Sequence, residues 1–157
     1  MAYTSASGIA SAALISALAL SSPVSLAATD GVADSANVGI ALDGLRSTRG
    51  NVLVCITRNP DAFPDCSRDP TSSRMRVAAT QAQSMRVAVP ANANYAIAVI
   101  HDENGNGRLD TMLAIPREGF GFSRNPRIRM GPPRFNDAAF AVGDTAVEES
   151  VRVRYML

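Results

Sequence analysis

Oxygen-bearing side chains recur at alternate positions in the polar segment HDENGNGRLD, residues 101–110. Asp102, Asn104 and Asn106 are spaced two residues apart, and Asp110 follows four residues later. Calcium takes about six to eight oxygen ligands, and alternate residues of a curled loop can direct their oxygens towards one point. The spacing therefore predicts a calcium-ordered loop.

Two more residues fit a calcium loop, and one does not. Gly107 stands where an EF-hand loop makes its sharp turn, and Arg108 stands where the ligand is a backbone carbonyl. The twelfth position, which should be a bidentate Glu, is Leu113, and the apolar run before the loop predicts a strand rather than a helix. The segment is therefore not an EF-hand. Glu118 is the nearest residue that could supply the missing carboxylate, and Glu103 is a weaker candidate.

A simple polar turn is the alternative interpretation of this loop. Gly105 and Gly107 would then serve only to adopt positive φ between two strands. Such a turn has no need of Asp110 at the spacing of a ligand, which favours the metal. With few carboxylates the site should bind calcium weakly, with a Kd of about 0.1–1 mM, and should order the loop rather than catalyse a reaction.

Catalytic groups find little support in the sequence. His101 is the only His and adjoins Asp102, an arrangement that a hydrolase could use. Neighbours along a strand point to opposite faces, so these two side chains form a poor dyad. The chain has no Lys, which removes Schiff-base chemistry, and no Ser in a nucleophile-elbow context. We therefore expect no enzymatic activity, with a hydrolase as the alternative.

Several Arg side chains fall in the Gly- and Pro-rich segment 115–135 and could bind an anionic ligand such as a phosphate or an acidic envelope glycan. They are Arg117, Arg124, Arg127, Arg129 and Arg134. The alternative is a solvated face, which is the commoner role of such a group. Across the whole chain the formal net charge is only +1, which gives no electrostatic case for a nucleic-acid partner.

The N-terminal segment resembles a secretory signal peptide. Gly8 to Leu20 is an apolar run too short to span a bilayer comfortably, Pro23 follows it, and small residues then precede Ala27 and Ala28. We expect residues 1–28 to be a signal peptide cleaved after Ala27 or Ala28, and residues 29–157 to be one periplasmic or secreted domain with no membrane span. An uncleaved N-terminal anchor is the alternative, because the segment before the apolar run carries no Lys or Arg.

The two Cys residues gain meaning from this compartment. Cys55 and Cys66 are separated by ITRNPDAFPD, whose Asn-Pro and Phe-Pro-Asp elements suit a compact loop. In an exported chain an even number of Cys at short spacing favours a disulfide. We therefore predict a Cys55–Cys66 bond.

Short alternating segments separated by turn residues predict strands along the mature chain. They are residues 37–45, 51–57, 74–80, 84–90, 94–102, 139–142 and 147–157. The first two should form a hairpin through RSTRG, and residues 94–102, the most apolar segment, should be the central strand. Residues 115–135 should be mainly irregular, with 127–130 as a short edge strand, and residues 135–142 should include one helical turn. The fold class expected is all-β: a single antiparallel Greek-key β-sandwich of about seven strands.

Three segments resemble a known family: YAIAVIHDENGNGRLDTMLAIPREGFGFSRNP, GPPRFNDAAFAV and CITRNPDAFPDC. They are similar to the exported bacterial domain of unknown function family 2141 over residues 38–155. The resemblance implies a secreted or periplasmic β-sandwich similar to transthyretin-like or carboxypeptidase-regulatory-like modules, and it implies no activity. The polar loop is also similar to calcium-binding sandwich repeats of bacterial surface proteins, although Glu118 lies further from Asp110 than in those repeats. We expect a binding or structural module of the cell envelope, with an envelope protein or glycan as its partner.

Overall fold

Alternation of apolar and polar residues sets the strands of this structure, a computed structural model that describes residues 34–157. In the first strand the side chains of Val38, Ile40 and Leu42 are buried, whereas Asn37, Ala41 and Asp43 are exposed. The segment predicted as a signal peptide, residues 1–28, lies outside the described residues. Between residues 34 and 157, no helix is both long enough and apolar enough to cross a membrane.

The described residues contain ten strands, one short α-helix and three 3-10 turns. The strands are β1 (Ser35–Asp43), β2 (Asn51–Thr57), β3 (Ser73–Ala78), β4 (Ser84–Pro90), β5 (Ala93–Asp102), β6 (Thr111–Met112), β7 (Ile115–Pro116), β8 (Gly119–Phe122), β9 (Phe140–Val142) and β10 (Val147–Arg152). The helix is α1 (Phe135–Ala138), and the 3-10 turns are η1 (Pro60–Ala62), η2 (Cys66–Arg68) and η3 (Ala79–Gln81). The all-β fold class is confirmed.

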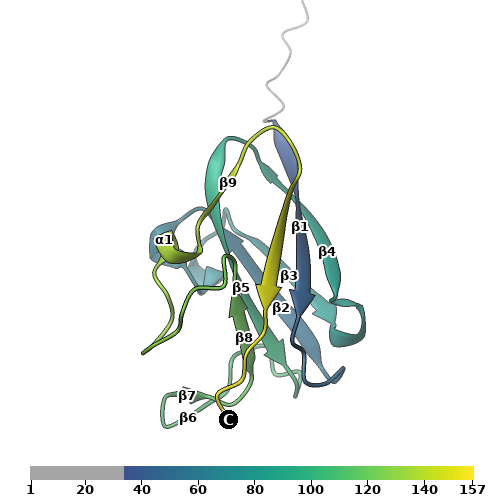
Figure 1. Cartoon of the computed structure of the whole chain (residues 1–157), viewed down its shortest axis with the longest axis vertical. Helices are drawn as coiled ribbons and strands as arrows, with labels where there is room; N and C mark the ends of the chain where they lie inside the picture. Colours follow the sequence, from purple (N-terminus) through teal and green to yellow (C-terminus); the bar gives the residue numbers. More distant parts are fainter. Residues whose placement is uncertain (1–33) are drawn as a thin grey trace, which may run out of the picture. The chain divides into compact units, whose positions relative to one another are not determined.

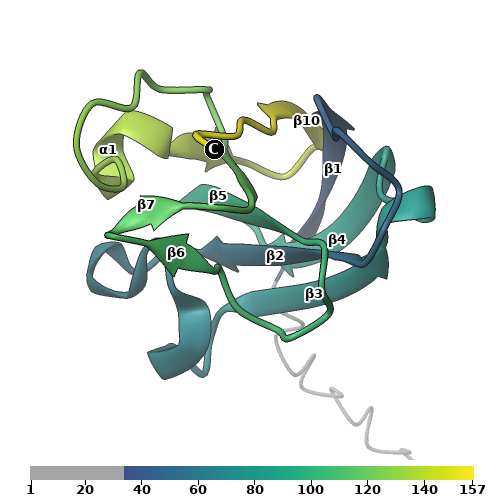
Figure 2. The ribbon, with the colours of Figure 1, turned by 90° about the horizontal axis from the view of Figure 1, so that it is seen from below.

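The strands form three sheets (Figures 1 and 2). A three-stranded sheet has the order β10-β1-β4, a five-stranded sheet has the order β3-β2-β5-β8 with β9 also pairing with β5, and β6 and β7 form a separate two-stranded ribbon. The expectation of about seven antiparallel strands therefore differs from the structure in number and in one pairing, because β1 and β10 run parallel. The extra strands are short ones, which a pattern of alternation over several residues does not detect.

One apolar cluster is shared by the two larger sheets. It contains Ile40 of β1, Val52 of β2, Met85 of β4, Ile97 of β5 and Val151 of β10, all nearly inaccessible to solvent. A second, smaller cluster covers the opposite face of the five-stranded sheet and includes side chains of β5, β8 and α1. Burial on both faces explains why β5 is apolar almost throughout, and its predicted central position is confirmed.

The predicted hairpin between residues 37–45 and 51–57 is wrong. β1 pairs with β4 and β10, whereas β2 pairs with β3 and β5, so the RSTRG segment connects the two sheets. Alternation reports which face of a strand is buried, but not which strand lies beside it. The connection brings Arg46 and Arg49 to the end of β5, where Asn51 pairs with Asp102.

Residues 115–135 are less irregular than expected, and the predicted edge strand at 127–130 is absent from the described chain. Instead, β8 forms from the sequence GFGF and is buried at every position. Gly121 permits this burial, because a β-carbon there would lie 2.8 Å from the carbonyl oxygen of Arg152. The segment is only four residues long and half of it is Gly, so it gave no strand signal in the sequence.

Two local predictions are confirmed. One helical turn, α1, precedes a short strand, β9, within residues 135–142. Cys55 in β2 and Cys66 in η2 form a disulfide, with their Cα atoms 5.7 Å apart. The bond ties the loop after β2 to the five-stranded sheet.

Candidate functional site

The polar loop begins at Asp102, the last residue of β5, whose side chain is fully buried beneath it. One carboxylate oxygen of Asp102 accepts a hydrogen bond from the Asn106 backbone N–H (3.0 Å), and the other accepts from the Gly107 N–H (2.8 Å). These bonds curl the loop back over the strand end. Gly105 and Gly107 have φ values of 76° and 83°, the left-handed conformation that favours glycine. The carboxylate thus organises the loop backbone around itself.

Three further side chains meet above Asp102. The Asp110 carboxylate accepts a hydrogen bond from the Asn104 side-chain amide (2.7 Å) and another from the Asn106 side-chain amide (2.9 Å). These amides lower the pKa of Asp110, Asn106 more than Asn104, so the carboxylate is favoured in its charged form. Asn104, Asn106 and Asp110 therefore meet at one place, with the amide hydrogens of both Asn side chains facing the carboxylate.

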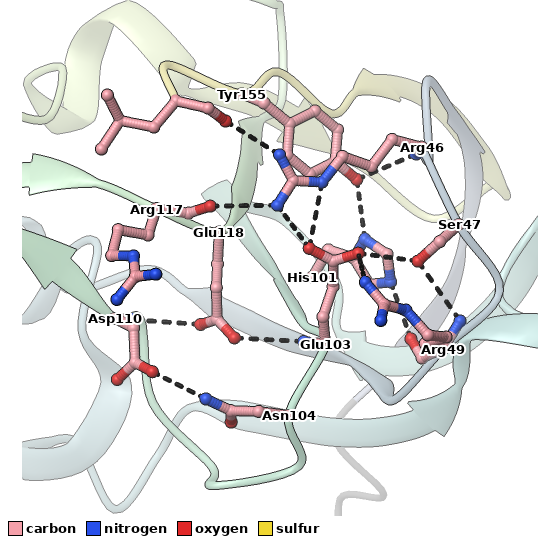
Figure 3. Close-up of polar contacts among 11 residues, drawn as sticks. Arg46, Ser47, Arg49, His101, Glu103, Asn104, Asp110, Arg117, Glu118 and Tyr155 are labelled. Atoms are coloured by element: carbon pink, nitrogen blue, oxygen red, sulfur yellow. Dashed lines mark hydrogen bonds and ion pairs between the residues drawn. The ribbon is translucent and has the colours of Figure 1, made fainter.

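Glu118 closes the base of the loop (Figure 3). It precedes β8, is only 5% exposed, and accepts hydrogen bonds from the backbone N–H groups of Glu103 (3.1 Å) and Asp110 (3.0 Å). The Arg117 N–H also donates to the Asp110 carbonyl (2.9 Å). Glu118 therefore lies at the loop, where the sequence suggested a further carboxylate, and it holds the two ends of the loop together.

Two Arg side chains lie against the loop. Arg108 is exposed and its Nε atom is 3.5 Å from a carboxylate oxygen of Asp110. Arg76 of β3 places a guanidinium nitrogen 3.3 Å from a carboxylate oxygen of Asp102. Over residues 34–157, no group of three or more His, Cys, Asp and Glu side chains is arranged to hold a metal ion. A cation in this loop would therefore need Asn amide and backbone oxygens as ligands in addition to carboxylates. The amide NH2 groups of Asn104 and Asn106 would also have to move away from the Asp110 carboxylate.

A second polar network lies beside the loop and was missed in the sequence (Figure 3). Glu103 points away from the loop towards Arg46, whose Nε and Nη2 atoms lie 3.0 and 2.6 Å from one carboxylate oxygen. The other oxygen accepts from the Ser47 hydroxyl at 2.7 Å and lies 3.4 Å from a nitrogen of Arg49. Hydrogen bonding to Arg46 lowers the pKa of Glu103 to about 2. The two networks share the loop backbone, since the N–H of Glu103 is held by Glu118.

His101 belongs to this network and has both ring nitrogens engaged. Its Nε2–H donates to the Arg49 carbonyl (2.9 Å), which leaves Nδ1 to accept from the Tyr155 hydroxyl (2.7 Å). Tyr155 also accepts from the Arg46 backbone N–H and stacks beneath the Arg46 guanidinium, 4.3 Å from the ring centre. His101 thus faces the connection between the sheets, whereas Asp102 faces the polar loop, and the two side chains bond to different partners.

The predicted anion-binding Arg residues do not gather in one place. Arg117 borders a polar pocket of ≈ 240 Å³ together with Arg46, Arg49 and the carboxylates of the loop. The other four lie exposed on the segment between β8 and β9: Arg124, Arg127, Arg129 and Arg134. Within the described chain, none of the five guanidinium groups forms an ion pair. Anion binding by this set stays a prediction.

Sequence comparisons place these features in a family. No curated protein and no solved structure matches the chain. A bacterial family described as "Uncharacterized protein conserved in bacteria (DUF2141)" matches residues 40–150, which include the polar loop, Glu118 and all of the described strands except residues 35–39 of β1 and 151–152 of β10. The chain therefore belongs to family DUF2141.

Proposed function

We propose that the protein is an exported, non-catalytic β-sandwich module of the bacterial cell envelope, with a loop that calcium orders. The observation that carries the proposal is the convergence of Asn104, Asn106 and Asp110 above the buried carboxylate of Asp102. Calcium prefers such carboxylate and amide oxygens. When calcium binds, the side-chain amides of Asn104 and Asn106 would turn so that their oxygens face the ion, in place of the NH2 groups that now donate to Asp110.

The remainder of the proposal rests on the domain around the loop. A disulfide between Cys55 and Cys66 is typical of oxidising compartments, which supports export. Two sheets that share one apolar core support a sandwich of the transthyretin-like or carboxypeptidase-regulatory-like kind with Greek-key connections. The structural engagement of both His101 nitrogens supports a binding or structural role over hydrolysis. The partner would be an envelope protein or glycan.

Calorimetric titration with calcium tests the metal. We expect heat of binding with a Kd of about 0.1–1 mM. At a free calcium concentration about ten times Kd, the free energy of unfolding should rise by about 1.4 kcal/mol over that measured with chelator. Asp110→Asn should weaken calcium binding at least tenfold, because it removes a charged ligand and places an amide against Asn104 and Asn106.

Asp43→Asn is the matched control, since Asp43 is an exposed residue in the other sheet whose carboxylate makes only a surface ion pair with Arg152. It should bind calcium as the native protein does. Identical melting temperatures in millimolar calcium and in chelator, with no heat of binding, would refute the calcium proposal. Equal affinities of Asp110→Asn and the native protein would refute the assignment to this loop.

A further inference from the structure

The β6–β7 ribbon, which follows the polar loop directly, carries an exposed apolar tip. Its residues 112–115 have the sequence MLAI, and the exposed fractions of Met112, Leu113 and Ile115 are 50%, 91% and 42%. Other strongly exposed large apolar side chains of the described chain are Met130, Met156 and Leu157. An apolar side chain that is 91% exposed contributes nothing to the core, so the tip calls for another explanation.

The turn at this tip is not made of the residues that such a turn favours. Leu113 and Ala114 have φ values of 51° and 64°, in the left-handed region. A two-residue hairpin with positive φ at both turn positions is best served by Asn-Gly, since other side chains adopt this conformation at a cost. The chain therefore displays an apolar side chain where a polar residue would suit the backbone better, a feature typical of functional positions.

The C-terminal residues lie beside the base of the ribbon. The Arg46 guanidinium donates to the carbonyl of Leu157 (2.8 Å) and to the carbonyl of Arg117 (3.2 Å), which adjoins β7. Figure 1 shows the C-terminus and the β6–β7 ribbon at the same end of the two sheets. Met156 and Leu157 thus lie at the same end of the sheets as the tip, and most of the exposed large apolar side chains of the described chain lie at this end.

Positive charge faces solvent around this apolar end. The side chains of Arg46, Arg49 and Arg108 are 42%, 77% and 78% exposed, whereas those of Glu103 and Asp110 are 10% and 31% exposed. Glu118 is buried as well, and Arg117, at the foot of the ribbon, is exposed. Glu103 and Glu118 therefore lie largely beneath the surface, and Asp110 is partly exposed. The guanidinium groups are the most exposed charges here, so the rim of the apolar tip complements an anionic surface.

We propose that residues 112–115 insert into the interfacial layer of an anionic phospholipid bilayer, with the surrounding Arg side chains contacting lipid phosphates. The tip projects from the sheets as a narrow ribbon whose backbone groups pair with each other, at Thr111 with Pro116 and Met112 with Ile115. A projecting ribbon with an apolar end and basic flanks suits insertion of about 5–10 Å into the headgroup region. A protein partner would need a pocket that matches the tip, whereas a bilayer needs no such shape. The inference goes beyond the calcium proposal and does not depend on it.

Sedimentation of the full chain with phosphatidylcholine vesicles, with and without phosphatidylglycerol, tests the proposal in calcium and in chelator. We expect binding to the anionic vesicles in at least one of these conditions. Leu113→Asn/Ala114→Gly should bind at least tenfold more weakly, because it removes the most exposed apolar side chain of the tip and keeps the turn. All variants carry the same N-terminal segment, so a difference between them reports on the ribbon. The melting temperature of Leu113→Asn/Ala114→Gly should equal or exceed that of the native protein, so that weaker vesicle binding by this variant cannot be due to unfolding.

Two further variants separate the outcomes. Met130→Ser removes an exposed apolar side chain outside the ribbon, where Met130 is 95% exposed, and should bind vesicles as the native protein does. Arg117→Gln should weaken binding to anionic vesicles and leave any binding to phosphatidylcholine alone unchanged. The proposal is overturned if the native protein does not bind anionic vesicles, or if Leu113→Asn/Ala114→Gly binds them equally well. It is also overturned if the native protein self-associates and that variant does not, since the tip would then join two copies of the chain.

Discussion

Replacement of Glu118 by Gln should open the polar loop at its base. The Glu118 carboxylate, 5% exposed, accepts one backbone N–H from each end of the loop, from Glu103 and from Asp110. Gln has one acceptor oxygen, so it can keep only one of these bonds, and its NH2 group would face the other N–H. An unpaired buried donor costs about 1–3 kcal/mol, and loss of the charge weakens the remaining bond by about 1 kcal/mol. We therefore expect the free energy of unfolding to fall by about 2–4 kcal/mol.

Urea unfolding followed by circular dichroism measures this change, and amide hydrogen exchange locates it. The N–H groups of Glu103 and Asp110 should exchange faster in Glu118→Gln, whereas those in the middle of β2 should slow or quicken only with global stability. Glu148→Gln is the matched control, since Glu148 is a surface residue of β10 with a side chain that is 61% exposed. It should change stability by less than about 0.5 kcal/mol. Equal stabilities of the two variants, with unchanged exchange at Glu103 and Asp110, would show that Glu118 does not hold the loop.

Two other predictions concern the surroundings of the loop. The pKa of Glu103 in the folded protein is about 2, below its usual value of 4.5, so its contribution is fully present above pH 4.5 and is lost as the pH falls towards 2. Because Arg46 is 42% exposed and its charge is partly screened by solvent, we expect the ionised Glu103 to contribute about 1–2 kcal/mol to the free energy of unfolding. Glu103→Gln should therefore lose less stability than the native protein as the pH falls from 4.5 to 2. Parallel plots of unfolding free energy against pH for the two proteins would contradict this prediction. Replacement of both Cys55 and Cys66 by Ser should lower the free energy of unfolding, measured by urea titration, by about 2–4 kcal/mol. The disulfide joins residues that are 11 positions apart, and it therefore restricts the conformations of the unfolded chain. A change under about 1 kcal/mol would show that the loop is held without the bond.

The fold was predictable where its cause is local. Alternation along residues 37–45 or 84–90 reports a half-buried strand, and two Cys residues at short spacing in a loop-forming sequence indicate their own bond. The partner of each strand was not predictable in this way, because the same alternation suits any neighbouring strand. β8 was missed because its burial depends on the C-terminal segment, with Phe120 bridging Arg154 and Gly121 lying against Arg152. The sequence GFGF does not by itself predict these contacts with the C-terminal segment.

The candidate site likewise has a part that local sequence predicts and a part that it does not. Asp102, Asn104, Asn106 and Asp110 lie within one short segment, so their spacing alone predicts that they meet. The network around Glu103 joins residues that are remote in sequence, since Arg46 is 57 positions from Glu103 and 109 positions from Tyr155. Its formation requires that β1, β5 and β10 all end at the same edge of the sheets. Only the topology supplies that information.

The polar loop and the apolar tip are consecutive parts of one segment, so a substitution in the loop can also alter the ribbon. Asp110 ends the loop and directly precedes the ribbon, and its backbone N–H is bonded to Glu118 and its carbonyl to the N–H of Arg117. Loss of Glu118 should therefore loosen both the loop and the ribbon, so Glu118→Gln cannot distinguish calcium binding from vesicle binding. Leu113→Asn/Ala114→Gly changes only side chains beyond this closure, and Asp110→Asn changes a carboxylate on the loop side of it. A pattern in which the first variant loses vesicles but keeps calcium, and the second loses calcium, would assign the two activities to separate parts of one continuous segment.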